Sequence, residues 1–252
     1  MPMSVTVSSS ASPRLHAAGE LFLALPAAVG VAAAVGAALG LAGTFALEVM
    51  AVYAGVSLVI LLHAPALAAE RGGPGLGTPN RITLARLLLV LPLVLFPLHP
   101  EALGVAGRWW AVGLGTAALS LDGVDGWLAR RTGSGTAFGA RFDMETDAGL
   151  ILLLSILVWR SGQAPAWTLL LGAMRYLFVA AGWILPALRA PLFPSLRRKV
   201  VCVVQGVALL VALGPVIPSS LATAAVGTAL VLLAWSFAVD TRWLLDGARR
   251  SR

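Results

Sequence analysis

The sequence predicts an all-α integral membrane protein that crosses the bilayer several times. Of its 252 residues, 59% are hydrophobic and 12% are charged, and the mean hydropathy is +0.90. Soluble domains are only about 45–50% apolar and about 25% charged. Uncharged runs of about 20 residues recur along the chain, which is the length that an α-helix needs to cross the hydrocarbon core of a membrane. A water-soluble globule is therefore excluded.

The first 70 residues predict a helical hairpin. Residues 21–47 contain no charged side chain, and neither do residues 49–69, whereas Glu48 lies between the two runs. We place the hinge near Gly43-Thr44. A cleavable signal peptide is a poor alternative, because the apolar stretch is far too long and a second span follows it directly.

The segment 70–81 is rich in glycine and proline and marks the predicted domain boundary. We divide the chain into an N-terminal tail and hairpin at 1–74, a six-span domain at 75–240 and a C-terminal tail at 241–252, with disorder expected from residue 247 onward. The six further spans are expected at 82–98, 107–129, 139–159, 166–188, 199–214 and 219–239.

Basic residues are distributed unequally between the two sides of this topology. Two arginines fall on one side, Arg108 and Arg160, and Arg175 lies inside a span. The other side receives fifteen basic residues: Arg14, Arg71, Arg81, Arg86, Arg130, Arg131, Arg141, Arg189, Arg197, Arg198, Lys199, Arg242, Arg249, Arg250 and Arg252. This bias predicts a bacterial-type inner or plasma membrane protein with both termini in the cytoplasm. It also argues against a nucleic-acid partner, despite the net charge of +7, because the basic residues follow helix ends and form no single patch.

Four aspartates inside the expected spans predict a metal site. At 100° per residue, Asp122 and Asp125 lie about 60° apart on one helix, and Asp143 and Asp147 lie about 40° apart on the next. Glu145 points elsewhere. An ionised acid within a membrane span costs about 2.5–3.5 kcal/mol, so this cluster needs a compensating cation. Carboxylates facing one another across two helices suit one or two hard divalent ions such as Mg²⁺ or Mn²⁺.

Three alternatives to an enzymatic metal site remain open at this point. The acids could form structural ion pairs with Arg130, Arg131 and Arg141. They could instead line the cation pathway of a transporter or channel, in which case they should be spread through the depth of the membrane. The chain could also be a non-catalytic scaffold. A cysteine-based or histidine-rich metal site is disfavoured, since the chain has one cysteine, Cys202, and three scattered histidines.

Two motifs resemble the signature of the CDP-alcohol phosphatidyltransferase family. The likeness covers about residues 75–240 and is greatest to bacterial members of the phosphatidylglycerophosphate and phosphatidylinositol-phosphate synthase kind. The main motif is Asp122-x-x-Asp125-Gly126-x-x-Ala129-Arg130, eight residues, then Gly139-x-x-x-Asp143-x-x-x-Asp147, and a shorter one is Thr78-Pro79-Asn80-Arg81-Ile82-Thr83. All eight fixed positions of the main signature are present.

The resemblance implies a six-helix membrane enzyme, preceded here by an additional two-helix hairpin. Such an enzyme transfers a phosphatidyl group from CDP-diacylglycerol to a small alcohol and releases CMP. It implies that Asp122, Asp125 and Asp143 bind one divalent ion and that Asp122, Asp143 and Asp147 bind a second. Asp147 would also be the general base. The expected partners are the two substrates, the bilayer and, as one option, a second copy in a homodimer.

The resemblance also implies a binding site for the CDP-lipid on the cytoplasmic side. Its residues would be Asn80, Thr83, Gly126, Ala129, Arg130, Thr136 and Gly139.

Basic residues in the later spans favour a phosphorylated acceptor. Arg175 lies in the middle of an expected span, where an arginine indicates a functional site by default, and Arg198 and Lys199 open the next span. Phosphate would supply the counter-charge that these cations lack. Glycerol 3-phosphate is the first choice, and inositol phosphate, serine and other alcohols are alternatives. Pairing of Arg175 with an acid of the cluster, and simple positive-inside topology for the other two, are the structural explanations.

Overall fold

The chain folds into α-helices, as the sequence predicts. The computed structural model describes residues 12–71, 75–132, 136–193 and 195–250, with side chains throughout except at 71, 79, 124–132, 137 and 248–250. Within these residues there are eight α-helices, four short 3₁₀ helices and no strand.

Each of the eight α-helices corresponds to one expected span. They are α1 (Pro13–Leu39), α2 (Thr44–Arg71), α3 (Thr78–Leu95), α4 (Val105–Thr132), α5 (Ala137–Arg160), α6 (Leu169–Ile184), α7 (Leu196–Leu213) and α8 (Ser219–Arg250). The 3₁₀ helices lie in the connections: η1 (Phe96–Leu98) and η2 (Pro100–Leu103) after α3, η3 (Ala166–Thr168) before α6 and η4 (Pro186–Arg189) after it.

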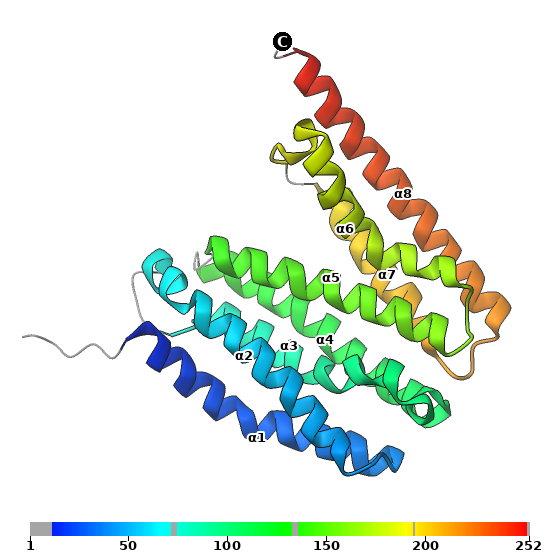
Figure 1. Cartoon of the computed structure of the whole chain (residues 1–252). Helices are drawn as coiled ribbons and strands as arrows, with labels where there is room; N and C mark the ends of the chain where they lie inside the picture. The colour runs from blue at the N-terminus through cyan, green and yellow to red at the C-terminus, as the bar shows by residue number, and fades with distance from the viewer. Residues whose placement is uncertain (1–11, 72–74, 133–135, 194, 251–252) are drawn as a thin grey trace, which may run out of the picture.

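The helices form three neighbouring groups (Figure 1). The hairpin of α1 and α2 lies along one side of the bundle, and it contacts α3 and the start of α5. Helices α3, α4 and α5 lie in the middle. On the other side, α8 packs against both α6 and α7, and α7 also contacts both α4 and α5.

The hairpin reverses direction at Gly40, slightly before the expected hinge. Gly40 ends α1 in the left-handed conformation, with φ of 61°, which glycine adopts without a steric penalty. The amide of the next residue, Leu41, donates to the carbonyl of Gly36 at 2.9 Å. The connection runs from Gly40 to Gly43, so the hinge predicted near Gly43-Thr44 falls at its end, next to the first residue of α2.

Five of the described helical segments are long and apolar enough to cross a membrane: α1, α2, α3 with η1, η3 with α6, and α8. The three remaining helices, α4, α5 and α7, were also expected to span. Two of them carry the acidic cluster, which lowers their hydropathy, and all three pack within the bundle beside the apolar helices.

The last helix continues beyond its expected end. Residues 247–250 were expected to be disordered, but α8 runs to Arg250. Two contacts hold the part of α8 that follows the expected span end at residue 239 against the preceding elements. Asp240 accepts a hydrogen bond from Arg197 at 2.6 Å, and the ring of Trp243 packs edge-on against Phe193 with centroids 5.2 Å apart.

Close packing of α5 and α6 brings the later spans near the acids. A Cβ placed on Gly172 would lie 2.3 Å from the Cα atom of Leu152, so only glycine permits this approach of the two backbones. Arg175 lies one turn after Gly172 and thereby faces α5.

Candidate metal and substrate site

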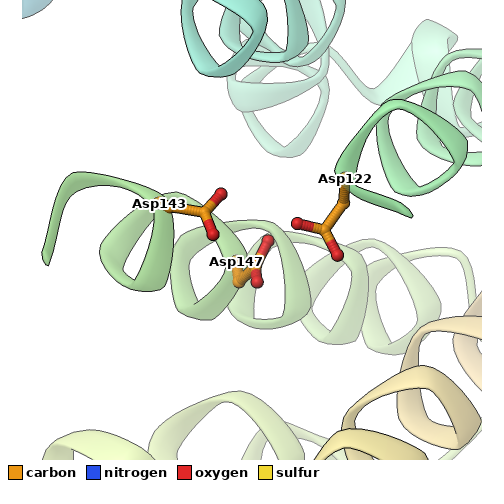
Figure 2. Close-up of side chains that lie close together, drawn as sticks. All are labelled: Asp122, Asp143 and Asp147. Atoms are coloured by element: carbon orange, nitrogen blue, oxygen red, sulfur yellow. The ribbon is translucent and has the colours of Figure 1, made fainter. Parts of the chain in front are cut away.

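Three of the expected metal ligands lie together between α4 and α5. Asp143 and Asp147 are one turn apart on α5, and Asp122 faces them from α4, as Figure 2 shows. One carboxylate oxygen from each residue lies within 4.8 Å of the other two. The facing arrangement is the one that helical spacing predicts.

Four other signature residues belong to the end of α4. Asp125, Gly126, Ala129 and Arg130 lie within the helical backbone, but their side chains fall outside the described part of the chain. The expected roles of Asp125 in metal binding and of the other three in CDP-lipid binding therefore remain predictions.

A buried arginine joins the three aspartates. The Nη1 atom of Arg86 lies 2.9 Å from Oδ1 of Asp122 and 2.5 Å from Oδ1 of Asp143, and its Nη2 atom pairs with Asp147. Its Nε atom donates to the carbonyl of Ala118 at 3.1 Å. The side chain of Arg86 is only 1% exposed, so its charge is fully committed to this cluster.

Sequence reasoning missed Arg86 as a site residue. It counted Arg86 among the cations of one membrane side, although the span expected at 82–98 already contained this residue; in the structure Arg86 lies in the third turn of α3. The available signal was the rule that an arginine within a membrane helix indicates a functional site. Without Arg86, the side that carries Arg14 still has far more basic residues than the side that carries Arg108 and Arg160.

The cluster fits a divalent cation by its charge and its donor atoms. Three carboxylates face a single guanidinium, which leaves two negative charges in excess. Each carboxylate has a second oxygen and further lone pairs beyond the contact with Arg86. Hard divalent ions prefer such oxygen ligands. These three residues could therefore hold a metal ion.

The starts of α3 and α5 meet beside this cluster. Asn80 is buried, and its Nδ2 atom donates to the carbonyl of Leu76 at 2.7 Å. A Cβ on Gly139 would lie 2.9 Å from both Oδ1 of Asn80 and Oγ1 of Thr136, so glycine allows these side chains to approach. Thr136 accepts a hydrogen bond from the amide of Gly139 and caps α5. The structure thus brings together three residues of the expected CDP-lipid site.

Thr83, a fourth residue of that set, lies one turn after Asn80 on α3. This residue is 1% exposed.

A cavity of about 1210 Å³ opens next to Asp147. Its wall comes from α5, α6, η4, α7 and α8, and much of it is apolar. The charged side chains that line it are Asp147, Asp240, Arg141, Arg175, Arg189 and Arg198. Arginines therefore outnumber acids in the lining, which makes the cavity a candidate site for an anion.

Arg175 enters this cavity from α6 and pairs with Glu145. Its Nη2 atom lies 2.5 Å from Oε1 of Glu145, and its Nε atom is buried without a hydrogen-bond partner in the structure. Glu145 is the acid that, by its helical spacing, was expected to face away from the aspartates. This ion pair is the structural alternative that the sequence left open for Arg175, although within the described residues Arg175 does not pair with Asp122, Asp143 or Asp147.

The three basic residues at the start of α7 differ in their surroundings. Arg197 pairs with Asp240 and bonds to Ser236, which ties α7 to α8. Arg198 lines the cavity, where it contacts the carbonyl of Phe193 and lies 3.7 Å from Oδ1 of Asp240. Lys199 is exposed and is not among the lining residues.

These features define a helical membrane protein with an acidic metal cluster beside an arginine-lined cavity. The family model for CDP-alcohol phosphatidyltransferases matches residues 76–239. The chain therefore belongs to this family of integral membrane enzymes, which transfer a phosphatidyl group from a CDP-alcohol to an alcohol acceptor. The match begins after the N-terminal hairpin. No solved structure matches the chain significantly.

Proposed function

We propose that the enzyme uses CDP-diacylglycerol as donor and a phosphorylated polyol as acceptor, with glycerol 3-phosphate as the first choice. The observation that carries this proposal is the cavity that extends from Asp147 to Arg175 and Arg198. Such an acceptor would place its hydroxyl toward the acid and its phosphate toward the arginines. The proposal corresponds to phosphatidylglycerophosphate synthase-like members of the family.

The reaction is a displacement at the phosphorus atom that carries the diacylglycerol. The acceptor hydroxyl oxygen forms a new bond to this phosphorus, and the bond from phosphorus to the bridging oxygen of CMP breaks. CMP leaves with that oxygen. Asp147, which faces both the aspartate cluster and the cavity, accepts the hydroxyl proton as general base.

The aspartates would hold two divalent ions, Mg²⁺ or Mn²⁺, through Asp122, Asp143 and Asp147, with Asp125 as a further ligand. When bound, such ions neutralise the pyrophosphate and the charge that develops on the departing CMP. Arg86 holds the three described carboxylates in a common orientation through its contacts with all of them.

The nucleotide would bind where α3 and α5 begin. Asn80, Thr83, Thr136 and Gly139 lie at these two helix starts, and Gly126, Ala129 and Arg130 of α4 would complete the site. Apolar side chains of the cavity, such as Phe178 and Trp183, suit the acyl chains of the donor. We place the whole site on the cytoplasmic side, as the distribution of basic residues favours.

The acceptor phosphate would bind to Arg175 and Arg198. Arg175 has an unpaired buried Nε atom, and burying a donor without a partner is unfavourable. A phosphate can accept hydrogen bonds from guanidinium groups and neutralise their charge. Arg189 is less suitable because its Nε atom already donates to the carbonyl of Gly182 at 2.6 Å. Lys199 is left out because it is exposed and does not line the cavity.

Other acceptors and another class of protein are less well supported. Inositol phosphate would satisfy the same arginines, whereas serine or choline would leave an excess of positive charge in the cavity. A cation channel would need acids spread along a pathway. The three described aspartates instead gather within 4.8 Å.

Substitution of the cavity arginines tests the acceptor assignment. Arg175→Gln and Arg198→Gln should each raise the KM for glycerol 3-phosphate by about one to two orders of magnitude, the effect of losing a contact worth about 1.5–3 kcal/mol. The KM for CDP-diacylglycerol should change little. CMP release by purified protein with Mg²⁺ or Mn²⁺ measures both constants.

Lys199→Gln is the matched control, because this cation neighbours Arg198 but does not line the cavity. It should leave the acceptor KM unchanged. An unchanged KM in well-folded Arg175→Gln protein would contradict a phosphate acceptor and favour an uncharged alcohol.

A further inference from the structure

The N-terminal hairpin lies outside the family match, yet all three of its acidic residues contact the family domain. These residues are Glu20, Glu48 and Glu70. Apolar side chains of the hairpin also pack against the rest of the protein, and these polar contacts fix the hairpin at defined points. Two of the three contacts lie beside the proposed nucleotide site, and the third lies at the other end of the hairpin.

Glu20 of α1 holds the start of α3. Its two carboxylate oxygens lie 2.9 and 3.0 Å from Nε and Nη2 of Arg81, in the bidentate geometry that makes such pairs strong. Its Oε1 atom also accepts from the amide of Leu76 at 3.2 Å. The carbonyl of Leu76 in turn accepts from the side chain of Asn80. Leu76 thus links Glu20 to Asn80, a residue of the proposed nucleotide site.

The backbone at Gly75 is adapted to this contact. Gly75 has φ of +80°, and a Cβ at this position would lie 2.4 Å from Oε1 of Glu20. A residue with a side chain would therefore be strained and would displace the carboxylate.

Glu70 of α2 holds the start of α5. Its Oε2 atom accepts from the amide of Phe138 at 3.1 Å, next to Gly139, whose amide is already bonded to Thr136. The first amides of a helix have no partner within the helix, and a carboxylate there also interacts favourably with the helix dipole. Glu70 therefore caps α5 from a different helix.

Apolar packing supports both contacts. Leu21, Ile60 and Leu67 of the hairpin form a buried cluster with Leu76 and Leu84, against which Phe138 and Phe142 of α5 also pack. The ring of His63 on α2 lies against that of Phe138, with centroids 5.6 Å apart. The hairpin thus contacts both α3 and α5 near Asn80, Thr136 and Gly139.

We infer that the hairpin is a positioning element of the CDP-lipid site: Glu20 and Glu70 hold the starts of α3 and α5 at the separation that binds the nucleotide. This inference rests on the proposed nucleotide site. It gives the hairpin a role in donor binding that is separate from acceptor binding, and neither glutamate contacts the substrate.

Kinetic constants of hairpin variants test this role. Glu70→Ala and Glu20→Ala should each raise the KM for CDP-diacylglycerol by about three- to tenfold, the range expected for loss of one helix cap. The KM for the acceptor should not change by more than about twofold, which is roughly the error of such an assay. Glu70→Gln should retain most donor affinity, since its amide oxygen still accepts from Phe138. Gly75→Ala should reproduce the effect of Glu20→Ala.

Glu48→Ala is the matched control. Glu48 contacts His99 at 2.8 Å from the opposite end of α2, so its loss removes a hairpin contact of similar kind far from the nucleotide site. It should lower the melting temperature without changing the donor KM. A donor KM raised equally by Glu48→Ala would overturn the inference, because the hairpin would then act only through overall stability.

Hydrogen exchange of the substrate-free full-length protein separates this inference from the proposed function. Glu70→Ala should accelerate exchange of the amides at residues 138–140, and Glu48→Ala should not. Unchanged exchange in Glu70→Ala would overturn the positioning role. If wild-type protein released no CMP from CDP-diacylglycerol, the proposed function would fail, whereas the exchange result would still decide whether Glu70 orders the start of α5.

Discussion

At the scale of single residues, the aspartates and Glu145 have different expected importance. Asp122→Asn or Asp143→Asn should reduce CMP release by at least about two orders of magnitude, since even outer-shell partners of a metal site are worth about 10–100-fold. Glu145→Gln should be mild, because Glu145 pairs with Arg175 and not with the cluster. If Glu145→Gln were as damaging as Asp143→Asn, the assignment of metal ligands would be wrong.

Arg86 should matter most when no metal is bound. Removing it as Arg86→Gln leaves three close carboxylates without their buried counter-charge, and breaking such a buried pair costs about 3–5 kcal/mol. Metal binding should recover much of this loss. The rise in melting temperature between EDTA and Mg²⁺ should therefore be larger in Arg86→Gln than in wild type.

Arg86→Lys provides the control for Arg86. Lysine keeps the charge but lacks the planar fork that contacts three carboxylates, so its metal-dependent rise should be intermediate. An equal rise in all three proteins would show that Arg86 does not compensate the charge of the cluster.

The residues that could be predicted from the sequence are those whose positions depend on helical geometry alone. Asp143, Asp147 and Asp122 meet because their spacing puts them on facing sides of two helices, and the same rule turns Glu145 away. Arg86, in contrast, lies on a different helix and is separated in the sequence from Asp143 by 57 residues and from Asp147 by 61. A spacing argument contains no information about such a distant contact. The pairing of Arg175 with Glu145 across α5 and α6 is of the same kind.

At the scale of helices, the packing of α6 on α5 should control the acceptor site. Gly172→Ala would place a Cβ 2.3 Å from Leu152 Cα, and overpacking of this kind costs about 1–3 kcal/mol. The displaced α6 carries Arg175, so the acceptor KM should rise together with the loss of stability. Thermal unfolding and CMP release measure the two effects.

Gly149→Ala is the control for Gly172→Ala. A Cβ at Gly149 on α5 would meet nothing within 4 Å, and replacing a helical glycine by alanine stabilises by up to about 1 kcal/mol. The acceptor KM should not change. Equal acceptor constants in Gly172→Ala and Gly149→Ala would contradict the link between helix packing and the position of Arg175.

Helix ends were predicted less accurately than helix positions, for identifiable reasons. Hydropathy marks where an apolar run stops, whereas a helix stops where its backbone loses partners. The first core span was expected from residue 82, but α3 starts at Thr78, because the polar residues before the apolar run already adopt helical geometry. The last helix passes its expected end because Asp240 and Trp243 contact earlier elements.

At the scale of the whole molecule, the hairpin, the central helices and the last three helices have separate tasks in this account. Helices α3, α4 and α5 supply Arg86, the acids and the proposed nucleotide site, and α6, α7 and α8 supply most of the arginine-lined cavity. The hairpin positions the starts of α3 and α5. Substitutions of the central acids should therefore change metal dependence. Substitutions in the hairpin should change donor affinity, and those in the last three helices should change acceptor affinity.

The most direct test of the central claim compares acceptors that differ only by a phosphate group. Purified protein is incubated with CDP-diacylglycerol, Mg²⁺ or Mn²⁺, and either glycerol 3-phosphate or glycerol, and CMP release is measured; inositol phosphate and inositol form a second pair, and serine is added alone. We expect kcat/KM to be higher for the phosphorylated member by about one to two orders of magnitude. Equal turnover of glycerol or serine would contradict the acceptor assignment, and absence of CMP release with every acceptor would contradict the proposed reaction itself.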